Sequence, residues 1–75
     1  MSTQFILSVI TPPSLERTMN PYFEYESRVF DSANEAIKVA KNEARRKKSY
    51  QTVVVDEIGG DTVKVLFCAG REFSD

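Results

Sequence analysis

A two-residue period of side-chain faces fits four stretches of this chain, and a helical period fits one. Apolar and polar positions alternate most clearly over residues 22–30, whereas residues 4–11 are apolar on both faces. The two-residue period, combined with β-branched and aromatic residues, predicts strands. The four strands are expected over residues 4–11, 22–30, 50–57 and 62–69. Gly59, Gly60 and Asp61 predict the turn between the last two strands.

The stretch 31–48 carries helix signals at both of its ends. Ser32 suits the N-cap, and Glu35, three residues later, completes a capping box. The cations of residues 45–48 suit the negative end of the helix. A regular helix would turn Lys47 onto the apolar stripe, so we expect the helix to end near Arg46 after about 14 residues, or roughly 21 Å. The stripe consists of Ala33, Ala36, Ile37, Ala40 and Ala44, and its small side chains allow a close approach to a sheet.

The element order predicts an α+β fold, β-β-α-β-β, with one helix on a four-stranded antiparallel sheet in a single small domain, residues 1–75. Strand 4–11 is apolar on both faces, because Phe5, Leu7 and Val9 alternate with Ile6 and Ile10. It is therefore expected at the centre of the sheet. With a right-handed crossover, the expected spatial order is 2-1-3-4.

Three local features stay open at this level. A three-residue loop in the last hairpin would place Val53 and Val55 beside Val65, whereas a two-residue loop would place Val54 there. The long connection 12–21 fits either a functional loop or a tether, and residues 14–17 could form one helical turn. Residues 70–75 are expected to be a frayed tail.

One helix can cover only one face of the sheet, so an apolar patch is expected on the other. In strand 22–30, Phe23, Tyr25 and Val29 share one face, and the charged residues share the other, which is expected to be wet. The patch is expected to contain Ile6, Ile10, Leu66, Cys68 and one valine from 53–55, with a charged border of Glu24, Glu26, Arg28 and Lys64. Such a surface is typical of a protein contact or a homodimer seam.

The amino-acid composition limits the kinds of chemical site that can be expected. The chain has 75 residues with one cysteine and no histidine, so neither an internal disulfide nor a zinc site nor a histidine-based triad is expected. We expect no cofactor, no metal, no catalysis, no signal peptide and no membrane span, and a cytoplasmic location. Cys68 is better explained as a strand residue than as a nucleophile, and Glu24 and Glu26 as a solvated edge than as an acid/base pair.

Charge is segregated along the chain in spite of a net charge of −1. Residues 33–49 carry six basic and two acidic side chains, whereas residues 50–75 carry two basic and five acidic ones. Nucleic-acid binding is therefore an alternative function, through Lys38, Lys41, Arg45, Arg46 and Lys48. Base stacking could involve Tyr22, Phe23, Tyr25 and Phe30, although core packing is expected to explain at least Phe23 and Tyr25.

The segment VFDSANEAIKVAKNEAR joins a strand, a short Asp-Ser turn and an alanine-faced helix. Over residues 23–55 this order resembles that of small phage-encoded inhibitor proteins, namely inhibitors of host RNA polymerase and anti-CRISPR proteins. The resemblance implies stoichiometric, non-catalytic binding to a host protein complex. Our leading hypothesis is thus a protein-binding module of the inhibitor type, with a host protein or a second copy as partner. An antitoxin or a homodimeric regulatory protein is a further alternative.

Overall fold

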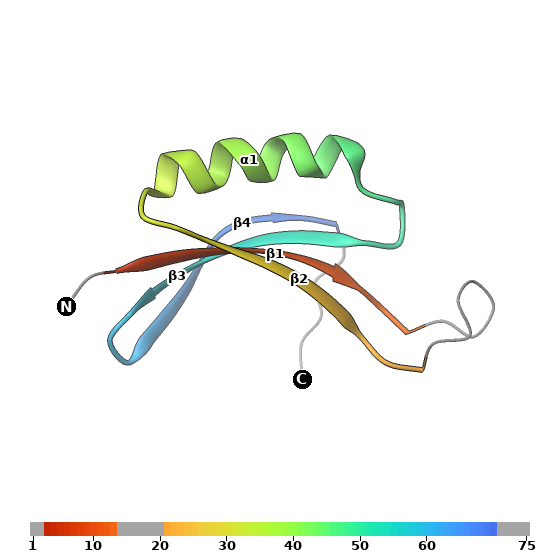
Figure 1. Ribbon diagram of the computed structural model, residues 1–75, viewed down its shortest axis with the longest axis horizontal. Coiled ribbons are helices and arrows are strands. Elements are labelled where there is room, and N and C mark those ends of the chain that lie inside the picture. Colours follow the sequence, from red (N-terminus) through yellow and green to blue (C-terminus); the bar gives the residue numbers. More distant parts are fainter. Residues whose placement is uncertain (1–2, 14–20, 71–75) are drawn as a thin grey trace.

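The computed structural model describes residues 3–13 and 21–70, which form one four-stranded sheet and one helix. The elements are β1 (Gln4–Thr11), β2 (Glu24–Phe30), α1 (Ala33–Arg46), β3 (Thr52–Gly59) and β4 (Thr62–Ala69). The strands are all antiparallel, in the order β2-β1-β3-β4. Figure 1 shows α1 lying along one face of the sheet. The predicted α+β fold and strand order are confirmed.

The helix begins and ends where its sequence signals are. The backbone N–H of Glu35 donates a hydrogen bond to Oγ of Ser32 at 3.4 Å, so Ser32 is the N-cap. At the other end, Lys47 is extended, with ψ 155°, and its N–H donates to the carbonyl of Glu43 at 2.8 Å. The helix therefore stops before Lys47 could turn onto its apolar side.

The core lies between α1 and the two central strands. Its fully buried members are Leu7 of β1, Val53 and Val55 of β3, and Ala36 and Ala40 of α1. The alanines let the helix backbone lie close to the sheet, and the larger side chains of Leu7, Val53 and Val55 fill the space between the two layers. A ring of half-buried side chains surrounds this core: Phe5, Val9, Phe30, Val39, Leu66 and Phe67. Val39 was not part of the predicted stripe.

The β3-β4 hairpin combines a two-residue turn with a β-bulge. Gly59 pairs with Thr62, and Gly60 has φ +58°, which a glycine adopts without strain. The register shifts between Val55 and Asp56, so the side-chain alternation of β4 is interrupted at Leu66. The strict alternation expected for this strand was therefore wrong: Leu66 and Phe67 both pack against the core. Val65 lies opposite Asp56 rather than opposite a valine.

The two faces of β2 are also the reverse of the prediction. Arg28 pairs with Leu7 and Glu26 with Val9, and partners in an antiparallel pair lie on the same face. The charged side chains of β2 therefore lie on the helix side. Charged side chains fit on the helix side because α1 packs mainly on β1 and β3. β2 is an edge strand, and all of its residues before Phe30 are exposed to solvent.

The remaining differences are at element ends. β2 begins at Glu24 rather than at residue 22, and β3 runs from Thr52 to Gly59 rather than over 50–57. The predicted helical turn at 14–17 and most of the predicted tail, residues 71–75, lie outside the described residues.

The close helix–sheet contact predicts the effect of a larger side chain at Ala40. Ala40 has no exposed surface, so Ala40→Leu should lower the free energy of unfolding by about 1–3 kcal/mol, the usual effect of overpacking. Asn42→Leu adds the same residue on the exposed side of α1 and should change stability much less. Urea denaturation followed by circular dichroism measures both. Equal stability of the two variants would contradict the close contact.

Candidate functional site

The sheet side turned away from α1, here called the open face, is largely apolar. Successive residues of a strand point to opposite faces, so the strand residues between the buried core positions, together with their cross-strand partners, form this face. Its apolar and aromatic members are Ile6, Ile10, Tyr25, Val29, Val54, Ile58, Val63, Val65 and Cys68. Tyr25, Val29, Val63 and Val65 are all more than half exposed. The amount of exposed apolar surface makes this face the leading candidate site.

The structure brings together only part of the predicted patch. Ile6 and Ile10 lie on the open face, as expected, and so do Val54 and Cys68. Leu66 does not, because the bulge turns it toward the core. The predicted charged border, Glu24, Glu26, Arg28 and Lys64, was misplaced: the register puts all four on the helix side.

Sequence reasoning missed the contribution of β2 to this face. Val29 lies beside Ile6, and Tyr25 beside Ile10. Phe23 stacks on Tyr25 with ring centroids 6.1 Å apart and an interplanar angle of 27°. Phe23 and Tyr25 are exposed, so the expectation that they pack in the core was wrong. The alternation of apolar and charged residues separated the two faces of β2 correctly, but it carries no signal for which face meets the helix.

One charged side chain, Asp56, interrupts the open face. Its cross-strand neighbours are Ile6 and Val65, and Val54 and Ile58 flank it along β3 on the same face. The carboxylate of Asp56 makes no hydrogen bond or ion pair with any residue in the described part of the chain. Desolvation by partial burial raises the pKa of its carboxyl above the ordinary value of 3.8.

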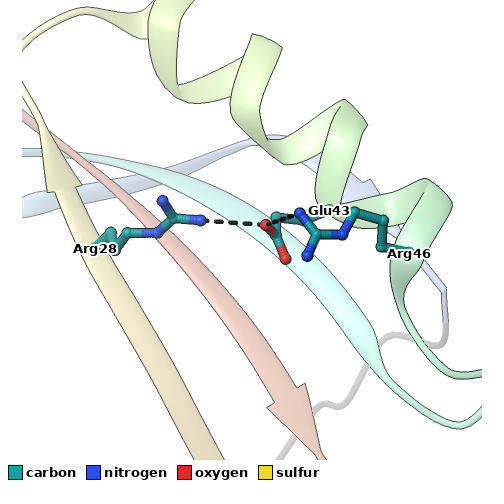
Figure 2. A network of polar contacts seen from close by, with 3 residues as sticks. All are labelled: Arg28, Glu43 and Arg46. Carbon is teal, nitrogen blue, oxygen red and sulfur yellow. Dashed lines mark hydrogen bonds and ion pairs between the residues drawn. The ribbon is translucent and has the colours of Figure 1, made fainter.

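The helix carries the basic surface. Lys38, Lys41 and Arg45 are exposed on its outer side, and among the described residues they have no ion-pair partner. Figure 2 shows a different role for Arg46: its guanidinium lies 3.9 Å from Oε1 of Glu43, which is also 3.3 Å from Nη2 of Arg28. The pair Arg28–Glu43 joins the edge strand β2 to α1. Lys48 is exposed in the connection after the helix.

A shallow hollow of about 380 Å³ lies near the ends of β1 and β2 and is lined by Val9, Thr11, Glu24, Tyr25, Glu26 and Gln51. The side-chain amide of Gln51 donates to Oγ1 of Thr11 at 3.0 Å. Glu24 and Glu26, considered above as an acid/base pair, thus border a common hollow, and both are exposed. Within the described ranges, no three metal-ligating side chains are gathered in one place.

The comparisons with known proteins gave no match. No protein-family model matches the chain, and neither a curated protein nor a solved structure is significantly similar to it. The resemblance to small phage-encoded inhibitors therefore stays a prediction. In the part of the chain that the structure describes, no helix has the length and apolar character needed to cross a membrane.

The environment of Asp56 predicts a pH-dependent stability. Because its pKa is raised in the folded state, its contribution to stability is fully present below the ordinary pKa of 3.8 and is lost as the pH rises through the raised value. Asp56→Asn should therefore raise the melting temperature at about pH 7 and give no gain at about pH 3.

Thermal denaturation followed by circular dichroism at both pH values measures the effect. The neighbours facing Asp56, Ile6 and Val65, are uncharged, and the other titratable side chains of this face are Tyr25 and Cys68. Asp61→Asn, at an exposed aspartate of the hairpin turn, is the matched control. A lower melting temperature for Asp56→Asn at about pH 7 would mean that the carboxylate has a stabilising partner.

Proposed function

We propose that this chain is a non-catalytic module that binds another protein through its open face. The observation that carries the proposal is the group of apolar side chains, Tyr25, Val29, Val63 and Val65, that are more than half exposed on one side of a sheet whose other side is covered by α1. Burial of apolar surface is the main favourable term in protein association. A contiguous apolar surface of this kind is typical of an interaction site.

The type of module proposed is a small inhibitor that acts by stoichiometric binding to a host protein complex in the cytoplasm. Its support is the resemblance of residues 23–55 to phage-encoded inhibitors of RNA polymerase and to anti-CRISPR proteins in their strand-helix order. A small domain with an open sheet face suits this role, because it can occupy a functional surface on a larger protein without chemistry of its own.

A pull-down from bacterial lysate with matched variants tests the use of the open face. Val65→Glu places a charge on an exposed position of this face, and Lys41→Glu places one on the outer side of α1. The wild-type chain and Lys41→Glu should both retain the same protein in a one-to-one ratio, and Val65→Glu should lose it by at least about tenfold, since a buried unpaired charge is costly.

Two outcomes would contradict the proposal. One is retention that depends on Lys41 and not on Val65, which would place the contact on the helix. The other is that the wild-type chain retains no protein and that light scattering shows both the wild-type chain and Val65→Glu to be monomers. The inhibitor role has its own assay: expression in a bacterium should impair transcription or restore plaques of a CRISPR-targeted phage, and Val65→Glu should abolish the effect.

Nucleic-acid binding is a second candidate function, favoured by Lys38, Lys41 and Arg45, which are exposed on the outer side of α1 and have no ion-pair partner among the described residues. These three side chains and Lys48 could contact a phosphate backbone along the helix, whereas the ion pair with Glu43 reduces the availability of Arg46. The aromatic side chains Tyr25 and Phe23 lie on the sheet rather than on the helix, so they would not add stacking to the same surface.

Fluorescence anisotropy with labelled DNA and RNA tests this candidate. If it holds, the double variant Lys41→Glu, Arg45→Glu should weaken binding by about tenfold or more, and the logarithm of the affinity should fall steeply with the logarithm of salt concentration. Val65→Glu should bind like the wild-type chain. An absence of binding at low salt would exclude the candidate.

A further inference from the structure

The open face carries a single charge near its centre. Across the described strands, Asp56 is the only charged residue whose cross-strand partners place it on this side. Its four neighbours on the face, Ile6, Val54, Ile58 and Val65, are all aliphatic. Nothing in the packing of the free chain requires a carboxylate here, because the position is only partly buried and faces away from the core.

The other central polar groups of the face are already paired. Oγ of Ser8 and Oγ of Ser27 lie 3.1 Å apart and form a hydrogen bond across β1 and β2. Asp56 has no such partner among the described residues. If a partner covered the face, the serine pair would keep its mutual hydrogen bond, whereas the carboxylate would lose its water and have no partner among the described residues.

An entirely apolar partner is therefore unfavourable at this position. Removing a carboxylate from water without a compensating charge is unfavourable, and this loss would offset much of the gain from burying the valines and isoleucines around it. A basic side chain opposite Asp56 would compensate that loss with a charge-assisted hydrogen bond. The apolar neighbours would then exclude water from the pair and strengthen it.

A second copy of the chain does not supply this complement. In a two-fold dimer formed through the open face, each copy presents the same surface, so two Asp56 carboxylates enter the interface with no basic residue from the strands opposite them. The basic residues of the described strands and helix lie elsewhere: Lys38, Lys41 and Arg45 are on the outer side of α1, and Arg28 and Lys64 are on the helix side of the sheet. Charge thus disfavours face-to-face self-association and favours a different partner.

We propose that the partner of the open face is a protein surface that is apolar except for one arginine or lysine, which binds Asp56. This inference rests on the proposed function and specifies the partner's chemistry. Asp56 then acts as the specificity determinant of the surface: it rejects purely apolar partners and other copies of the chain, and it fixes how the basic partner is placed. The surrounding aliphatic side chains supply the buried area.

Matched helical peptides test the inference without the natural partner. Three synthetic peptides share a leucine-rich face and differ only in its central residue, which is arginine, glutamine or glutamate. Each is titrated into the full chain with labelled methyl groups, and the signals of Ile6, Val54 and Val65 report binding to the open face. The arginine peptide should bind wild type at least about fivefold more tightly than the glutamate peptide, with glutamine between them.

Asp56→Asn should remove the preference for arginine and leave the affinity for the glutamine peptide equal or greater. Asp61→Asn, which changes an aspartate in the hairpin turn, should keep the preference. If all three peptides bind the open face of the wild-type chain equally, the requirement for a basic partner is wrong, while the proposed function survives. If no peptide perturbs these methyl signals, or the shifts are on α1, the open face is not a docking surface and both proposals fail. A wild-type dimer that Val65→Glu dissociates would make a second copy the occupant and would overturn the inference.

Discussion

The structure depends on the close contact between the alanine side of α1 and the two central strands. Ala36 and Ala40 are completely buried against Leu7, Val53 and Val55, and these five residues form the entire fully buried apolar core of the described chain. A core of this size leaves a small free energy of folding. The N-cap at Ser32 therefore matters because it stabilises the start of the helix, and the ion pair between Glu43 and Arg28 matters because it joins the last turn of the helix to β2.

The same contact decides which surfaces stay exposed. Because α1 is centred on β1 and β3, the edge strands extend beyond it on both sides. On the helix side this leaves room for the charges of β2, which reach water or the helix rather than the core. On the other side the sheet has an apolar surface, and none of the described elements lies over it (Figure 1). A single helix on four strands thus gives two chemically different surfaces: a basic outer helix and an apolar open face.

The open face also shows a conflict between stability and recognition. A carboxylate among aliphatic side chains disfavours the folded state, since desolvation raises the pKa of Asp56. Such a group is more easily understood as part of a binding surface than as part of the scaffold. The serine pair on the same face differs from Asp56, because its two hydroxyls form a hydrogen bond with each other. The charged edge strand β2, with Glu24, Glu26 and Arg28, opposes edge-to-edge association.

The sequence by itself determined the elements, the helix limits and the strand order. Ser32 and Lys47 define the helix through local hydrogen bonds, and the two apolar faces of β1 place that strand in the centre. It also indicated that Ile6 and Ile10 would lie on the face of the sheet that is turned away from the helix. Only the tertiary structure decided which face of β2 joins them and that Leu66 turns inward, because pairing register and a bulge depend on contacts between distant strands. The isolation of Asp56 follows from the same register, since its aliphatic neighbours come from three different strands.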